Sequence, residues 1–131
     1  MLSAYLLVSS VAVHASACAL FGALYLQRRA PEHRAFALVA GLVGAYAASN
    51  ALFRLGGTDA LREIGVRAAW SVGPLAAAAY VDFCARLTPS LPRAVVRAAY
   101  GLAGVSAVVA GVGPLVDASA GVPPVGQTEP R

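Results

Sequence analysis

The residues of this chain that could do chemistry are few, and they lie within long apolar stretches. His14 falls near the middle of the first stretch, and Arg67 and Asp82 fall near the two ends of the third. An ionisable group inside a membrane is costly and often functional. His14 is therefore either a neutral side chain that hydrogen-bonds to a neighbouring helix, or a group that senses a ligand or protons.

Arg67 and Asp82 are fifteen residues apart, which is about 22 Å along one helix, so they cannot pair with each other. We expect Arg67 to extend to the outer headgroups, with Asn50 of the second stretch as its candidate partner. Asp82 precedes Arg86 by four residues, a spacing that lets the two form an ion pair. The alternative for Asp82 is a place in a conduction or proton path.

Gly73 and Pro74 stand together inside the third stretch, shortly after Trp70, the only tryptophan of the chain. A proline inside a helix removes a backbone hydrogen bond and kinks the helix. The kink either shapes a ligand pocket or sets how the helices pack. We expect Trp70 to anchor its helix at the membrane interface, where tryptophan is enriched.

Motifs for catalysis are missing from the sequence. It has no phosphate-binding loop, no pair of carboxylates on one face of a predicted helix and no Ser/His/Asp set. Zinc needs about four ligands, and apart from His14 the only histidine is His33, in a predicted connection. Cys18 and Cys84 are expected to act as small apolar side chains, not as a disulfide. We therefore predict no enzymatic activity, no metal and no cofactor.

The composition predicts a membrane protein. Hydrophobic residues make up 59% of the 131 residues and charged residues 12%, whereas soluble domains average roughly 45–50% and 25%. A chain this short cannot bury so much apolar surface in a core of its own, so lipid must cover it. The ten arginines lie in short runs between apolar stretches, which argues against a nucleic-acid-binding face.

The pattern of apolar and polar residues predicts an all-α membrane protein, an up-down bundle of four transmembrane helices within residues 1–116. The expected helices span about residues 4–26, 35–53, 64–86 and 94–116, each long enough to cross a hydrocarbon core of roughly 30 Å. Thr58 or Asp59 is the expected N-cap of the third helix. Residues 117–131 are rich in Pro and Gly and are predicted to be a disordered tail.

The arginines also predict the orientation of the helices. Six follow the first or third helix, namely Arg28, Arg29, Arg34, Arg86, Arg93 and Arg97, and four lie on the other side, namely Arg54, Arg62, Arg67 and Arg131. Short basic loops stay in the cytoplasm. Abundant Ala, Gly, Arg and Val without Lys is typical of a GC-rich bacterial genome. We expect a multi-pass protein of the bacterial inner membrane, with the N-terminus and the C-terminus both outside.

Small residues recur at every fourth position on three of the predicted helices. These stripes are Ala15, Ala19 and Ala23; Gly41, Ala45 and Ser49; and Ala103, Ala107 and Gly111. Small residues let helices approach closely in a membrane, where the hydrophobic effect does not drive their association. The sequence leaves open whether the stripes join helices of one chain, two copies of the chain, or the chain and a partner.

Features from the first helix to the third resemble the N-terminal seven-transmembrane region of bacterial sensor histidine kinases, over roughly residues 5–115. The matching residues are Arg28-Arg29, Arg34-Ala35-Phe36-Ala37-Leu38, Arg67, Gly73-Pro74, Phe83 and Arg86-Leu87-Thr88. The resemblance implies an outside N-terminus and a role in signal perception within a two-component system. The chain departs from that pattern in having four of the seven helices, and Tyr46 where tryptophan is usual. It has no phospho-accepting histidine box and no ATP site, so the resemblance implies a truncated or standalone sensor half without kinase activity.

We thus expect an integral membrane protein that perceives a signal and has no catalytic activity. One alternative is a small four-helix transporter subunit that dimerises, like the small multidrug resistance family, although that family depends on a glutamate where this first helix carries only His14. Another is a structural or assembly protein. The expected partners are the lipid bilayer and a second copy or other membrane helices.

Overall fold

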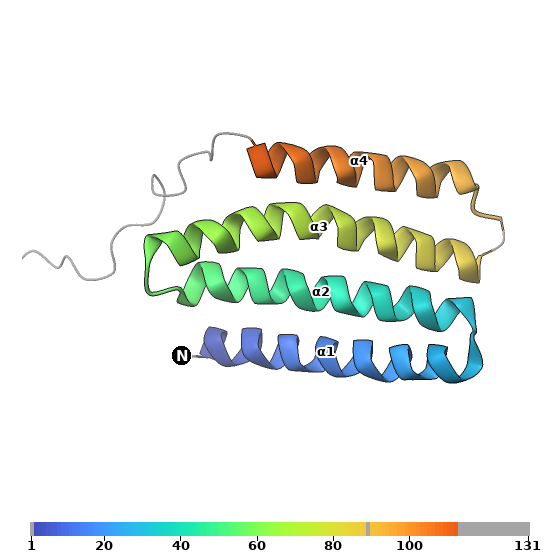
Figure 1. Ribbon diagram of the computed structural model, residues 1–131, viewed down its shortest axis with the longest axis horizontal. Helices are drawn as coiled ribbons and strands as arrows, with labels where there is room; N and C mark the ends of the chain where they lie inside the picture. The colour runs from blue at the N-terminus through green and yellow to red at the C-terminus, as the bar shows by residue number, and fades with distance from the viewer. Residues whose placement is uncertain (1, 89, 113–131) are drawn as a thin grey trace, which may run out of the picture.

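Four long helices make up the fold, which we analysed as a computed structural model that describes residues 2–88 and 90–112. They are α1 (Leu2–Arg28), α2 (Pro31–Leu55), α3 (Asp59–Leu87) and α4 (Arg93–Val112). Successive helices run in opposite directions (Figure 1), and all four are long and apolar enough to cross a membrane. The predicted all-α, up-down architecture is confirmed. The predicted tail and the last residues of the predicted fourth helix lie outside the described residues.

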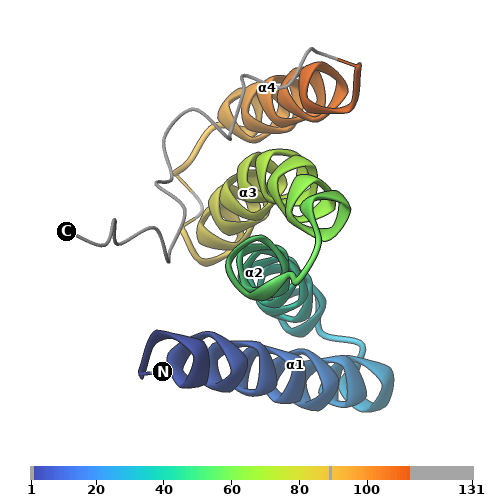
Figure 2. The same ribbon diagram turned by 90° about the vertical axis from the view of Figure 1, so that its left-hand side faces the viewer.

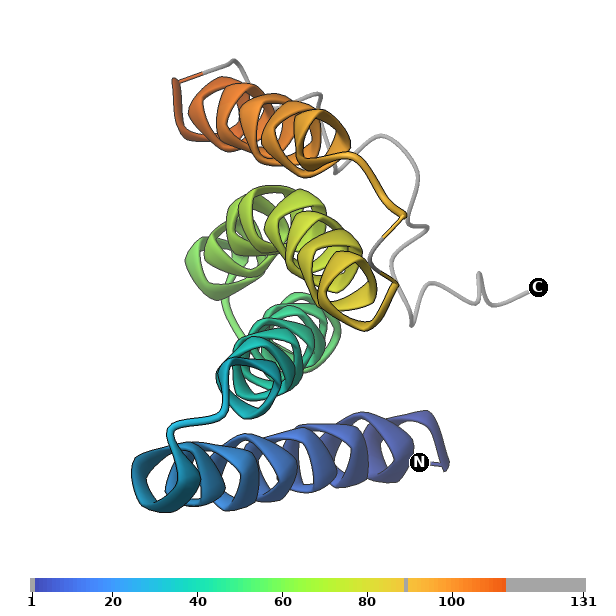
Figure 3. The same ribbon diagram turned by 90° about the vertical axis from the view of Figure 1, so that its right-hand side faces the viewer.

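The helices form an open row instead of a closed ring. α1 packs on α2, α2 on α3 and α3 on α4, and no other pair of helices is in contact within the described part of the chain. The end-on views show the row twisting from α1 to α4 (Figures 2 and 3). As a result, α1 and α4 each have a single helical neighbour.

The connection between α1 and α2 is shorter than predicted. Only Arg29 and Ala30 separate the two helices, and α2 begins at Pro31 rather than near residue 35. Proline suits the first position of a helix, because the backbone N–H that it lacks would have no partner there. Arg29 ends α1 with a left-handed φ of 54°, and its N–H donates to the Tyr25 carbonyl oxygen at 2.7 Å.

α3 also begins earlier than predicted, at Asp59 rather than near residue 64. Of the two predicted caps, the structure uses Thr58, whose side-chain oxygen accepts a hydrogen bond from the Leu61 N–H at 3.3 Å. Such a cap satisfies one of the free N–H groups of the first turn. The helix can therefore begin at polar residues, which a prediction from the apolar pattern alone leaves out of the helix.

The packing is that of a protein surrounded by lipid. Where the structure describes burial, every buried hydrophobic residue is an alanine: Ala35, Ala40, Ala47, Ala76, Ala78, Ala79 and Ala103. Large apolar side chains point outward instead, such as Leu102 at 71% exposure and Trp70 at 68%. A water-soluble domain shows the opposite distribution, because it buries its large side chains. The chain is a multi-pass membrane protein whose helices meet through small residues.

Glycine permits the closest helix approach, between α2 and α3. A Cβ added to Gly65 would lie 2.5 Å from the Phe53 nitrogen and 2.8 Å from the Ser49 oxygen, both backbone atoms. Between α1 and α2, a Cβ on Gly44 would lie 3.1 Å from the His14 Cβ, and a Cβ on Gly41 would lie 3.2 Å from the Cys18 Sγ. Parts of the predicted small-residue stripes therefore join neighbouring helices within one chain.

We predict that Gly65→Ala destabilises the protein by about 2 kcal/mol or more, because the new methyl group overlaps backbone atoms that can move only if the two helices separate. The measurement is reversible unfolding in mixed micelles by titration with sodium dodecyl sulfate, followed by circular dichroism.

The control is Gly101→Ala on the exposed side of α4, where a Cβ would meet nothing within 4 Å. This variant should be as stable as the wild type or slightly more stable, since alanine is the better helix former. Equal stability of the two variants would contradict the close approach of α2 and α3.

Candidate functional site

A groove between α2 and α3 brings together four of the residues that the sequence singles out. Its volume is about 490 Å³, and it is lined by Tyr46, Asn50, Phe53, Val66, Ala69, Trp70, Gly73 and Pro74. The predicted kink residues, the predicted interfacial anchor and one predicted polar membrane residue thus share one site. Clefts of this size with apolar walls and a few polar groups are typical of small-molecule sites.

Gly73 shapes the wall of this groove. A Cβ at this position would lie 3.3 Å from the Tyr46 Cε2 atom, so the glycine allows the Tyr46 ring to lie directly against α3. Tyr46 itself was predicted only as a departure from the sensor pattern, and Phe53, Val66 and Ala69 were not predicted at all. The signal for Phe53 is the helical spacing that places it on one face of α2 with Tyr46 and Asn50. The same spacing places Val66 and Ala69 on one face of α3 with Trp70 and Gly73.

Pro74 leaves a backbone acceptor without its usual partner. Proline has no N–H, so the Trp70 carbonyl oxygen receives no hydrogen bond from the residue four positions later. α3 nonetheless remains one helix from Asp59 to Leu87, and it follows a bowed path (Figure 1). The Ser71 hydroxyl, which donates to the Arg67 carbonyl oxygen at 2.9 Å, adds to the bend because such bonds distort the helical ladder.

Asn50 supplies the side-chain amide of the groove. Its Nδ2 donates to the Tyr46 carbonyl oxygen at 2.8 Å, within α2. The amide oxygen and the second N–H have no partner among the hydrogen bonds of the described residues, so both can meet a ligand. The groove therefore combines aromatic and aliphatic walls with the side-chain amide of Asn50.

The expected pairing of Arg67 with Asn50 is wrong. Arg67 Nη2 lies 2.9 Å from Glu63 Oε1, one turn earlier on α3, and Nη1 donates to the Gly111 carbonyl oxygen of α4 at 3.3 Å. Arg67 thus reaches α4 and not Asn50 of α2. A guanidinium group near the C-terminal end of a helix donates to carbonyl groups that have no partner in the helix, and its positive charge is attracted to the negative end of the helix dipole.

We predict that Arg67→Gln loosens the last turn of α4 while leaving the rest of the row intact. Amide hydrogen exchange at residues 108–112 should accelerate several-fold, because the hydrogen bond to the Gly111 carbonyl is lost and local opening costs less. Arg54→Gln is the control, since Arg54 is exposed and has no ion pair or hydrogen bond among the described residues. The same acceleration in both variants would mean that Arg67 does not hold α4.

Asp82 and Arg86 form the predicted ion pair. Arg86 donates from Nη2 at 3.0 Å and from Nε at 3.2 Å to the same carboxylate oxygen, Oδ2. The Asp82 side chain is 20% exposed. The arrangement neutralises a carboxylate that would otherwise face the membrane alone.

His14 bonds within its own helix rather than to a neighbouring helix as expected. Its Nδ1 lies 2.7 Å from the Ser10 carbonyl oxygen, and because a carbonyl only accepts, Nδ1 must be the protonated nitrogen. His14 packs on α2 at Gly44, whereas Asp82 lies on α3, which α1 does not contact. The structure therefore does not bring the two ionisable candidates for a proton path together.

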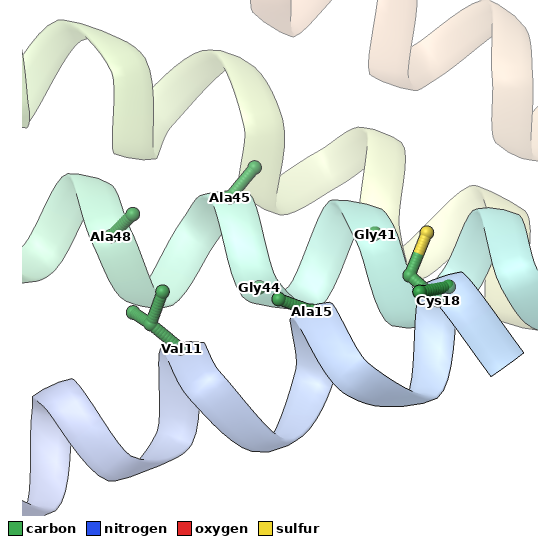
Figure 4. Close-up of a pocket in the computed structure, with 8 residues that line it drawn as sticks. Val11, Ala15, Cys18, Gly41, Gly44, Ala45 and Ala48 are labelled. Atoms are coloured by element: carbon green, nitrogen blue, oxygen red, sulfur yellow. The ribbon is translucent and has the colours of Figure 1, made fainter.

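A second groove runs between α1 and α2 (Figure 4). It is lined by small apolar residues, namely Val11, Ala15, Cys18, Ala19, Gly41, Gly44, Ala45 and Ala48. Apart from the weakly polar Cys18 thiol, none of these side chains can form a hydrogen bond. A ligand in this groove would make van der Waals contacts and almost no hydrogen bonds to side chains. The groove between α2 and α3 is therefore the stronger candidate site.

Comparison with protein-family models, curated proteins and solved structures gives no match to this chain. The resemblance to sensor histidine kinases and the orientation in the membrane therefore stay predictions.

Proposed function

We propose that this membrane protein perceives a signal by binding an apolar molecule from the bilayer in the groove between α2 and α3. The observation that carries the proposal is the convergence of Asn50, Trp70, Gly73 and Pro74 on that groove. Of the two grooves, it alone combines apolar walls with strong hydrogen-bonding groups. A molecule with a hydrocarbon part and one hydroxyl or amine fits this combination.

The groove is accessible from the lipid phase. Trp70 is 68% exposed and Tyr46 is 43% exposed, so both aromatic walls border the surface that lipid covers. A ligand can therefore enter sideways from the bilayer. Its hydroxyl or amine hydrogen would bond to the Trp70 carbonyl oxygen, which Pro74 leaves free.

Binding at this position can change the shape of α3. The bend at Pro74 lies beside the ligand, and a helix that lacks one hydrogen bond is easier to bend than an intact one. A ligand that binds one curvature more tightly than another shifts the population toward it. A change in the curvature of α3 moves its distal end, where Asp82 and Arg86 are paired.

The resemblance to sensor histidine kinases supports this role and indicates where the signal would go. On this proposal, the chain lies in a bacterial inner membrane with the ends of α1 and α3 in the cytoplasm. The altered curvature of α3 would be read by a histidine kinase of a two-component system. The chain itself would contribute perception and no phosphoryl transfer.

The first test uses Trp70 as its own reporter, because it is the only tryptophan. The probe is 11-bromoundecanol, whose bromine quenches indole fluorescence on contact. In lipid nanodiscs we expect quenching that saturates with probe concentration for the wild type. Ala69→Leu should abolish the saturating component, because the larger side chain fills the groove.

The matched control is Ala98→Leu, at an exposed position of α4 away from the groove, which should bind the probe like the wild type. Quenching that rises without saturation, equally in all three proteins, would mean that Trp70 meets the probe only as part of the bilayer. That result would remove the groove as a binding site.

The second test asks whether the bend transmits binding. We expect 11-bromoundecanol to change amide hydrogen exchange in residues 75–87 of the wild type at least about twofold, and to leave Pro74→Ala unchanged, because the restored hydrogen bond stiffens the helix. Pro92→Ala, in the exposed turn before α4, is the control and should respond like the wild type. A full response in Pro74→Ala would show that the bend is incidental to perception.

A further inference from the structure

The end of the row opposite the α2–α3 connection is strongly basic. The α1–α2 connection and the α3–α4 turn both lie at this end (Figure 1). Six exposed arginines gather there, and we call them the basic rim: Arg28, Arg29, Arg34, Arg86, Arg93 and Arg97. The carboxylates of the described residues at the same end are those of Glu32 and Asp82, so positive charge is in excess there.

The other end of the row is nearly balanced. Arg62 lies 4.0 Å from Asp59, and Arg67 lies 2.9 Å from Glu63. In the basic rim, by contrast, Arg86 is the only arginine with a carboxylate partner among the described residues. The remaining five arginines are exposed and have no ion pair within residues 2–88 and 90–112, so they can bind an anion.

The corner between α1 and α2 concentrates this charge. Its two-residue connection places Arg28 at the last turn of α1, Arg29 in the connection and Arg34 in the first turn of α2. The Arg29 guanidinium lies 5.8 Å from the centre of the Tyr25 ring, a cation–π distance that holds it beside the helix. Arg28, Arg29 and Arg34 thus all lie at one corner, together with one carboxylate, that of Glu32.

An aromatic cluster fixes the helix ends that carry the rim. The Phe21 and Phe36 rings have their centres 4.2 Å apart, and the Phe36 and Phe83 rings 5.5 Å apart. These contacts join α1, α2 and α3 through direct packing of aromatic rings. The backbones of the rim arginines on α1, α2 and α3 are therefore held next to one another.

The surface beside the rim is apolar. Leu26, two residues before Arg28, is 65% exposed, and Leu87, directly after Arg86, is 59% exposed. A ligand for this place has a phosphate group for the guanidinium donors and a hydrocarbon chain for the leucines. A free phosphate ion would bind the guanidinium groups and leave the exposed leucines uncovered.

We propose that the basic rim binds the headgroups of anionic phospholipids, chiefly at the corner formed by Arg28, Arg29 and Arg34. The occupant is a lipid of the surrounding bilayer, with its acyl chains along Leu26. The proposal is independent of the groove between α2 and α3, and it does not depend on which way the protein faces.

The test measures lipid selectivity by electron spin resonance of the whole protein in phosphatidylcholine vesicles. Spin-labelled phosphatidylglycerol should associate with the protein at least about threefold more strongly than spin-labelled phosphatidylcholine, since each arginine near the surface adds attraction. The selectivity should fall in 0.5 M NaCl, which screens it.

Two double variants of equal charge change decide the location. Arg28→Gln with Arg34→Gln should lower the selectivity by about half or more, because it removes two of the three corner arginines, whereas Arg54→Gln with Arg62→Gln at the other end should leave it unchanged. Arg28→Lys with Arg34→Lys should keep most of it, and circular dichroism should show the same helix content in each protein. The proposal would be overturned if both glutamine variants lost the same selectivity, or if the wild type had a selectivity of one. It would also be overturned if 10 mM inorganic phosphate displaced the lipid.

Discussion

Close contact between helix backbones is the constraint on which this structure depends. Lipid covers the large side chains, so the hydrophobic effect does not pull the helices together, and they must associate through van der Waals contact at short range. That requires alanine and glycine at every interface, and the buried residues of this chain meet the requirement. Gly65 is the extreme case, since its missing Cβ leaves room for the backbone of α2 at Phe53.

The same constraint makes the groove between α2 and α3. The groove begins beside the Gly65 contact, at Phe53 and Val66, and extends along α3 to Gly73 and Pro74. The proline also leaves a carbonyl that lipid cannot satisfy. The site thus arises from one tight contact, one bend and one missing hydrogen bond on a single helix.

The architecture was predictable from the sequence because composition and helix length dominate it. The ion pair of Asp82 with Arg86 was predictable because four-residue spacing fixes it within one helix. Contacts between helices were harder to predict. The partners of Arg67 and His14 depend on which face each helix turns to its neighbour. A helix surrounded mostly by lipid is apolar on all sides, so its sequence does not mark that face. The open row could not be predicted for the same reason. A stripe of small residues indicates that another helix packs there, but it does not indicate which helix.

The open row has a consequence for assembly. Each described helix contacts only the helices next to it in the chain, so every interface joins segments separated by a short connection. Contacts of this kind form quickly, because little loop-closure entropy is lost. The α1–α2 pair can therefore dock while α4 is still being synthesised, and the row can grow in the order in which its helices enter the membrane. A defect in α4 would then leave the earlier pairs correctly formed.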